Sequence, residues 1–462
     1  MEQTMKDDQQ NEKFIKMTTA PIGPLIIGLA IPSAIIMLIS ALYNMADTFF
    51  VSFLGTSATA AVGVSFPLMA VIQAVGFFFG HGSGNYIARE LGAQNYTNAS
   101  KMAATGFFSA FIAGVLLAIF GVLFLEPLVR LLGATDTILP FAREYLRFIL
   151  IGAPFMMCSL MQNNLLRYQG SSFYGMIGMV SGALINIALD PLFIFVFHLG
   201  SGGAGLATMI SQFISFCILL IASGKKDNVR IRFKYFSPSL ANYREMLRGG
   251  LPSLARQGIA SISGICMNNF AGSFGDEAIA AITIVQRVFM MAASLVAGIG
   301  QGFQPVCGFN YGAKLYPRVK QGFLFSMLVM TIPLIPLGIL GFIFAPQIIA
   351  LFRPDDTLLI EIGARVFRYQ CYTIPLLGWV TINSMMMQTM GKAFKASLLA
   401  IARQGLFMLP LLFLLTPLFG FTGIAVSQPL ADFGTFILSI PLSISVFREM
   451  KHDSPGAITI KK

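Results

Sequence analysis

Apolar runs long enough to cross a lipid bilayer recur along the whole sequence, and they constrain the fold more than any other feature. About 20 predominantly apolar residues suffice for a helix to span the hydrocarbon core. The chain is 56% hydrophobic and only 11% charged, against roughly 25% charged residues in soluble domains. We therefore predict an all-α integral membrane protein with twelve transmembrane helices and no large soluble domain. The predicted spans are 24–52, 60–80, 101–125, 141–165, 173–197, 204–223, 250–271, 279–300, 320–343, 358–388, 395–416 and 422–446.

Lysine and arginine gather in alternate connections between these spans. The connection 225–248 is strongly basic, 314–320 and 392–395 are basic too, and the connections after the first, fifth, seventh and eleventh spans contain neither residue. The positive-inside rule then places both termini and the basic connections in the cytoplasm. The expected location of the spans is a prokaryotic plasma membrane. The net charge of +11 is explained by this topology and by attraction to anionic lipid, so no nucleic-acid partner is expected. The polar, mixed-charge segment 1–23 does not resemble a cleaved signal peptide.

The two halves of the chain repeat each other. Residues 53–71 align with 273–291 at an offset of 220, and 91–96 match 311–316 at the same offset. Each half contains six spans, an even number, so both halves enter the membrane in the same orientation as parallel repeats. Two bundles around a central cleft suit alternating access, although a duplicated structural scaffold is the alternative. The predicted organisation is a cytoplasmic tail 1–23, an N-lobe 24–224, a basic linker 225–248, a C-lobe 249–447 and a cytoplasmic tail 448–462.

Four polar residues of the N-lobe lie at similar predicted depth. Asp47 is about 5 residues from the outer end of the first span and Asp190 about 7 from that of the fifth, or roughly 8 and 10 Å at the helical rise. Asn186 precedes Asp190 by one helical turn on the same face, and Thr208 lies near the outer start of the sixth span. An Asp at the bilayer centre costs roughly 2.5–3.5 kcal/mol, which makes these residues candidates for function.

This set predicts a site for a proton or a hard cation. Two close carboxylates in a low-dielectric environment share a proton or are bridged by a cation. Oxygen ligands suit H⁺ or Na⁺ and do not suit soft metals. Pro191 adds an oxygen, because it leaves the carbonyl of Ile187 without its helical donor. The alternative is that each Asp only forms hydrogen bonds that fix packing.

A proline in the first span and several charged residues in the second half complete the candidates. Pro32 is expected to kink the first span, either as a static bend or as a conformational hinge that straightens with the state of Asp47. The second half lacks the carboxylate site, since Met267, Phe407 and Leu411 occupy the matching positions. The candidate cavity or substrate contacts are Asn44, Arg256, Arg287, Arg403 and Asp432, with Arg403 and Asp432 as an expected ion pair and the arginines either structural or facing anionic parts of substrates.

The sequence excludes several other classes of function. It contains no phosphate-binding G-x-x-x-x-G-K-[ST] motif, no kinase motifs, no G-x-S-x-G and no H-E-x-x-H. The five cysteines and three histidines have no metal-type or paired spacing. We therefore expect a protein that is not an enzyme, has no cofactor besides H⁺ or Na⁺, and draws its energy from an ion gradient.

The chain resembles the multidrug and toxic compound extrusion (MATE) family along nearly its whole length. The motifs that carry the resemblance are "NMADTFFVSFLG" (44–55), "LRYQG" (166–170), "NIALDPLFIF" (186–195), "GAGLAT" (203–208) and "QPVCGFNYGAK" (304–314). The resemblance implies a V-shaped, twelve-helix antiporter that exports cationic or amphipathic drugs against H⁺ or Na⁺. It places the family's N-lobe ion site on Asp47, Asn186, Asp190 and Thr208, and the family's bending proline on Pro32.

The chain is more similar to the bacterial DinF-like and MepA-like branches than to the norfloxacin-exporter branch. The seventh span carries Arg256 and no acid, and the tenth has only Glu361, near its outer start. Ion coupling is therefore expected to rest on the N-lobe of a monomer embedded in the lipid bilayer, with small-molecule drugs or toxins as its partners. A flippase for lipid-linked or amphipathic lipids of the same superfamily is the first alternative. An integral membrane transferase is the second, and an ion channel is disfavoured because no filter-like repeat is present.

Overall fold

The computed structural model describes residues 2–225, 228–352, 354 and 356–452, and within them it contains helices, turns and no strand. Ten of the helices are long and apolar enough to cross a membrane. With α9 and the broken pair α13 and α14, they make up the twelve predicted spans, so the all-α fold class is confirmed. The first lobe, which we call the N-lobe, consists of α2 (Ile22–Ser52), α3 (Thr56–Gly92), α4 (Tyr96–Leu123), α5 (Leu125–Leu131), α6 (Leu139–Tyr168), α7 (Ser172–Pro191), the π-helical turn η1 (Leu192–Val196) and α8 (Gly200–Ser223).

The second lobe, the C-lobe, repeats this order after a connection that contains the short turn η2 (Phe233–Tyr235). Helix α9 begins at Leu240, so the last part of the predicted linker is helical. Ser239 caps this helix, because its side chain accepts a hydrogen bond from the backbone N–H of Asn242. The helices of the C-lobe are α9 (Leu240–Gly272), α10 (Asp276–Gly312), α11 (Tyr316–Ile343), α12 (Ala345–Ala350), α13 (Thr357–Cys371), α14 (Leu376–Thr389), α15 (Ala393–Ile401), the π-helical η3 (Ala402–Met408), α16 (Leu409–Phe419) and α17 (Phe421–His452).

The tenth predicted span, 358–388, is made of two helices in the structure. Helix α13 ends at Cys371 and α14 begins at Leu376. Pro375 explains the break, since it has no N–H to donate to the carbonyl of Cys371 and its ring clashes with that carbonyl in a regular helix. Within the break, the buried side chain of Thr373 donates a hydrogen bond to Asp432 on α17 at 3.2 Å.

Backbone geometry confirms the internal repeat. Residues with positive φ recur at the offsets of the sequence match: 106° at Gly55 and 105° at Gly275, and 58° at Gln94 and 59° at Lys314. Gly170 and Gly391, at 80° and 74°, follow the same rule at an offset of 221. Left-handed backbone is costly for residues with a Cβ, so matching turns at matching positions indicate a duplicated structure.

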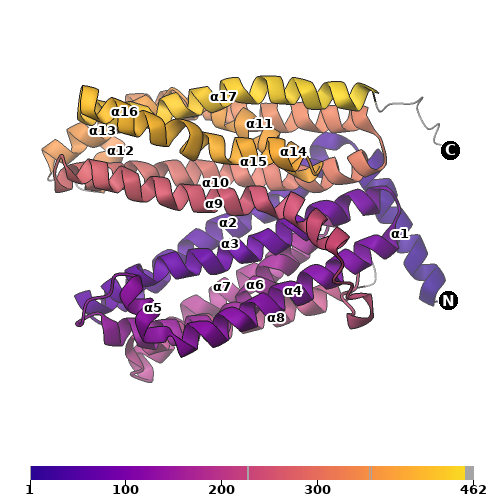
Figure 1. Ribbon diagram of the computed structural model, residues 1–462, viewed down its shortest axis with the longest axis horizontal. Helices are drawn as coiled ribbons and strands as arrows, with labels where there is room; N and C mark the ends of the chain where they lie inside the picture. The colour runs from indigo at the N-terminus through magenta and orange to yellow at the C-terminus, as the bar shows by residue number, and fades with distance from the viewer. Residues whose placement is uncertain (1, 226–227, 353, 355, 453–462) are drawn as a thin grey trace.

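The two lobes form a V (Figure 1). They meet at the end that carries both termini and diverge toward α5 and α12. The contacts between lobes are themselves repeated, because α3 packs on α9 as α10 packs on α2. Helices α3 and α10 cross with their backbones in close contact at Gly92 and Gly312. A Cβ at Gly92 would lie 2.1 Å from the carbonyl oxygen of Phe309, and one at Gly312 would lie 2.0 Å from that of Arg89.

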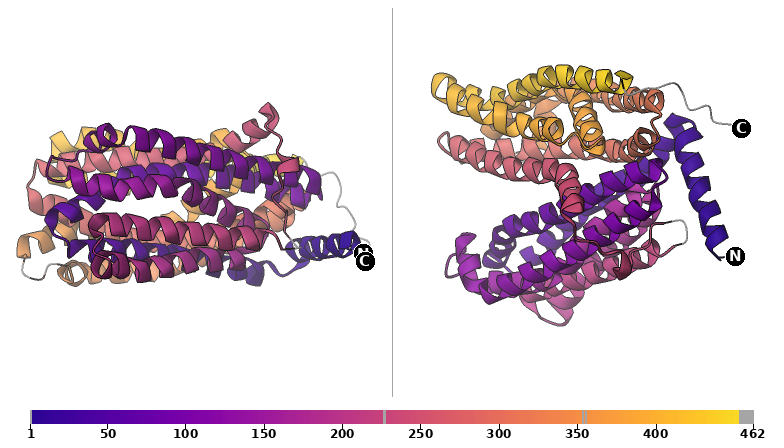
Figure 2. Two further views of the ribbon diagram at one scale, coloured as in Figure 1. Left: turned by 90° about the horizontal axis from the view of Figure 1, so that it is seen from below. Right: turned by 45° about the vertical axis from the view of Figure 1, so that its right-hand side comes forward.

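Helix α1 (Glu2–Thr19) lies across the closed end of the V (Figure 2). It contacts both lobes: Lys13 donates to Ser171 of the N-lobe at 2.7 Å, and Asn310 of the C-lobe donates to the carbonyl of Met17 at 3.1 Å. Arg318 donates to the carbonyl of Ala20 at 2.6 Å, just beyond the helix. The segment that was predicted only as a polar tail therefore ties the two lobes together.

Candidate ion-binding site

The predicted polar residues of the N-lobe gather on three neighbouring helices. Helix α2 supplies Asp47, α7 supplies Asn186 and Asp190, and α8 supplies Thr208, and α7 packs against both other helices. All four side chains are buried, with Asn186 and Asp190 at 0% exposure. The matched depths that the sequence predicted place these groups together.

Asn186 connects the groups on α7 and α8. Its amide donates to Asp190 Oδ1 at 3.4 Å and to Thr208 Oγ1 at 3.2 Å. The carboxyl groups of Asp47 and Asp190 are close enough to interact electrostatically. The four side chains therefore form one oxygen-rich site, to which helices α2, α7 and α8 all contribute.

Two tyrosines that sequence reasoning missed complete the cluster. Tyr145, fully buried on α6, donates its hydroxyl to Asp47 Oδ2 at 3.0 Å. Tyr43 lies one turn before Asp47 on α2, near both carboxyl groups. Tyr145 lies six residues, or about 9 Å, inside the outer end of its helix, and this depth, which is visible in the sequence, matches that of Asp47 and Asp190.

Three acceptor oxygens of the site have no hydrogen-bond partner among the described residues. They are Asp47 Oδ1, Asn186 Oδ1 and Asp190 Oδ2, and each is buried. Buried polar atoms are normally paired, so three acceptors in one cluster have room in their bonding for a proton, a cation or a water. In the described part of the chain no three His, Cys, Asp or Glu residues gather as a transition-metal site would require. The oxygen donors fit a proton or a hard monovalent cation.

Asn44 and Pro32 lie on α2 outside this cluster. Asn44 is half-buried and donates to the carbonyl of Ser40 at 2.8 Å, so it does not join the carboxyl groups. Pro32 is buried at the junction with the C-lobe, between Ala30 and Ala34, which touch α10 at Gly302 and Gly298. Helix α2 is continuous through Pro32.

The matching position of the C-lobe is apolar. Met267, Met408 and Leu412 form a buried cluster there, and Phe407 and Leu411 pack against it. Two charged residues of this lobe, Arg403 and Asp432, lie elsewhere, beside the break between α13 and α14. Arg403 Nε lies 2.6 Å from Asp432 Oδ1, so the predicted ion pair is present.

Asp432 is fully satisfied. Gln428 donates to its Oδ1 at 2.9 Å, and Thr373, in the break between α13 and α14, donates to its Oδ2 at 3.2 Å. The other two arginines are not part of this cluster. Arg256 makes a long contact of 3.4 Å to Ser253, and Arg287 is exposed on α10. The C-lobe thus contains a closed charge pair, whereas the N-lobe contains unpaired acceptors.

The fold and this site define a multi-pass helical membrane transporter with two repeated lobes. The MatE family model matches residues 32–192 and again 252–414, together more than half of the chain, so the chain belongs to the MatE family. The two matches begin 220 residues apart, at Pro32 and at Pro252, a second helix-internal proline that sequence reasoning missed.

The relatives agree with this assignment. The chain is 26% identical to the multidrug export protein MepA of Staphylococcus haemolyticus over 99% of its own length and 100% of that protein. Among solved structures, a MATE protein in the bent conformation matches with a TM-score of 0.89 at 26% identity, covering 95% of this chain and 98% of that one. A MATE protein in the straight conformation matches with a TM-score of 0.88 at 26% identity, covering 95% and 99%.

Proposed function

We propose that this protein is a cation-coupled multidrug efflux antiporter that exports amphipathic, often cationic compounds by alternating access. The observation that carries the proposal is the pair of buried carboxyl groups with three unpaired acceptor oxygens in the N-lobe. The name of the staphylococcal relative, a multidrug export protein, supports the choice of substrate class.

The coupling ion, H⁺ or Na⁺, is proposed to bind at Asp47, Asn186, Asp190 and Thr208. A cation there satisfies the unpaired oxygens and removes the cost of burying a second negative charge beside the first. Tyr145 holds one oxygen of Asp47 in place and leaves the other available. Binding of the ion weakens the protein's hold on a cationic drug, because the carboxyl groups lose net negative charge.

Helix α2 is proposed to transmit this change. It carries Pro32 at the junction of the lobes and Asp47 fifteen residues later, about 22 Å along the helix. A proline leaves a helix without one hydrogen bond and lowers the cost of bending there. Solved relatives described as bent and as straight indicate that proteins of this fold adopt more than one conformation, and we propose Pro32 as the conformational hinge here.

The test is transport into reconstituted liposomes. A fluorescent cationic dye is presented under a pH gradient or a Na⁺ gradient, and the proposal predicts dye movement driven by one of them. Asp47→Asn should abolish it, while Asp136→Asn, at a carboxylate whose side chain is 87% exposed, should not. No movement under either gradient, or normal transport by Asp47→Asn, would contradict the proposal. The first outcome would favour the flippase, which a labelled lipid would then test.

A further inference from the structure

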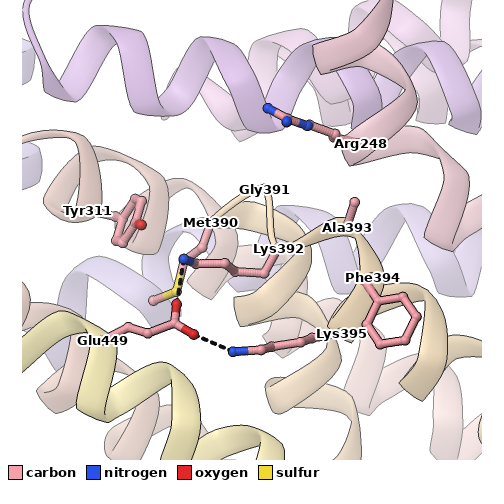
Figure 3. A pocket seen from close by; sticks show the side chains of 9 residues that line it. All are labelled: Arg248, Tyr311, Met390, Gly391, Lys392, Ala393, Phe394, Lys395 and Glu449. Atoms are coloured by element: carbon pink, nitrogen blue, oxygen red, sulfur yellow. Dashed lines mark hydrogen bonds and ion pairs between the residues drawn. The ribbon is translucent and has the colours of Figure 1, made fainter.

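A pocket of about 470 Å³, whose lining side chains are drawn in Figure 3, lies at the end of the C-lobe where Gly391 approaches Arg89 of the N-lobe. Its lining comes from the first turns of α9, the last turn of α10, the turn between α14 and α15, and the end of α17. This end carries the basic connections that the positive-inside rule assigns to the cytoplasm. The pocket lies far along the chain from the N-lobe carboxyl groups and plays no part in the proposed ion site.

The pocket has an excess of positive charge. Lys392 and Lys395 share one carboxylate, that of Glu449, at 2.6 and 2.5 Å. Arg248 faces them from the opposite side in Figure 3 and shares Glu245 with Arg89. Among the described residues, these four cationic groups are paired with two carboxylates, so cations outnumber carboxylates beside the pocket. An anion is the ligand that such a lining favours.

The N-lobe has the equivalent recess, and there the chain fills it. Leu91 and Gln169 line it and correspond to Tyr311 and Met390 of the open pocket at offsets of 220 and 221. Only about 10 Å³ remain free, because α1 packs into the recess. Lys13 donates to Ser171, the residue that matches Lys392. The repeat therefore produces the same recess twice. One recess receives a cation from the chain itself, while the other presents cations to whatever enters it.

Phe394 identifies the kind of anion. Its side chain lines the pocket and is 79% exposed, and in Figure 3 this apolar ring lies on the side away from Glu449 and the ammonium groups of Lys392 and Lys395. The first turn of α15 adds backbone N–H groups at the same place, since no side chain caps that helix. An amphipathic anion with a phosphate head and apolar chains matches this combination.

We propose that the pocket binds the phosphate headgroup of an anionic phospholipid of the cytoplasmic leaflet. The phosphate lies among Arg248, Lys392 and Lys395, and the acyl chains leave past Phe394. A soluble phosphate compound has the same head chemistry, but it gains nothing from the exposed ring. Bound lipid covers a recess beside the junction of the lobes, the position that α1 covers in the N-lobe.

The test measures lipid binding by the full chain in a neutral detergent, and it needs no transport. Phosphatidylglycerol, phosphatidylcholine and glycerol phosphate are added separately, and retained lipid and thermal stability are recorded. Phosphatidylglycerol should bind and stabilise, while the other two should not. Equal effects of both lipids would overturn the proposal, and so would an equal effect of glycerol phosphate, which would assign the site to a soluble phosphate.

Two variants separate a lipid site from a structural ion pair. Lys392→Gln should weaken phosphatidylglycerol binding about fivefold, the share of one basic residue at a membrane surface. Glu449→Gln should strengthen binding by a similar factor, because it removes the negative charge that the two ammonium groups share. Lys320→Gln removes an exposed cation on α11 and should change nothing. If Lys392→Gln and Glu449→Gln both weaken binding, the three residues serve only to hold the helices together and the proposal is wrong.

Discussion

Replacing Arg403 with methionine removes the positive partner of Asp432 and leaves that carboxylate buried at 2% exposure. Breaking a buried pair from one side costs about 3–5 kcal/mol, because the remaining charge has lost its compensation. Gln428 and Thr373 still donate to Asp432, so the lower end of the range, about 3 kcal/mol, is expected for Arg403→Met. The double variant Arg403→Met/Asp432→Leu should recover most of this loss, since an apolar pair of similar volume replaces the ionic one.

The protein contains a single tryptophan, Trp379, on α14 just after the broken helix, so its fluorescence reports unfolding of this lobe directly. Unfolding of the four proteins of the double-mutant cycle gives the coupling between the two residues. If the double variant is as unstable as Arg403→Met, the loss of stability does not come from leaving Asp432 without its positive partner, and the reasoning is wrong. A double variant that is stable but inactive in transport would show that Arg403 or Asp432 contacts substrate.

Three further predictions concern the ion site, the junction of the lobes and α1. Tyr145→Phe removes a hydrogen bond to the Asp47 carboxylate, worth about 1.5–3 kcal/mol, and so destabilises the ion-free form of the site. The coupling cation then binds more tightly, and half-maximal transport should need about tenfold less of it. Gly312→Val places a side chain against the Arg89 carbonyl and should separate α3 from α10 at the closed end. Buried Cys307 should then react faster with a thiol reagent, whereas the control Gly264→Ala, in open space, should not change the rate. Unchanged reactivity of Cys307 would mean that the crossing of α3 and α10 does not close this end. Asn310→Ala removes the hydrogen bond to Met17, worth about 1 kcal/mol, and trypsin should then cleave faster at Lys13 and Lys16. Equal cleavage rates in this variant and the parent would contradict a docked α1.

The fold could be predicted because lipid imposes simple rules on a sequence. Backbone groups must be satisfied within each helix, so apolar length alone identified the spans. The matches at offsets of 220 and 221 gave the repeat, and positive φ at Gly55 and Gly275 confirms it in the backbone. The break before Leu376 was missed because the run 358–388 stays apolar through Pro375, and hydropathy does not report a lost hydrogen bond.

The cluster around Asp47 could be predicted as a set of residues but not as a network. Depth placed Asp47, Asp190, Asn186 and Thr208 at one level, and the packing of α7 between α2 and α8 brought them together. Tyr145 lies at a matching depth as well, but nothing in its own span shows that its hydroxyl meets Asp47. The docking of α1 was missed for the same reason, since Lys13 finds its partners Ser171 and Asn228 far along the chain.

The central claim is that a cation at the N-lobe carboxyl groups displaces the drug. The most direct measurement is the release of a bound fluorescent dye from the purified protein, followed by anisotropy, as Na⁺ is added at fixed pH and as acid is added at fixed Na⁺. The account predicts that one of the two titrations releases the dye from the parent protein and that neither does so from Asp47→Asn/Asp190→Asn. Release from the double variant at the same cation concentration, or retention of the dye by the parent protein in both titrations, would contradict it.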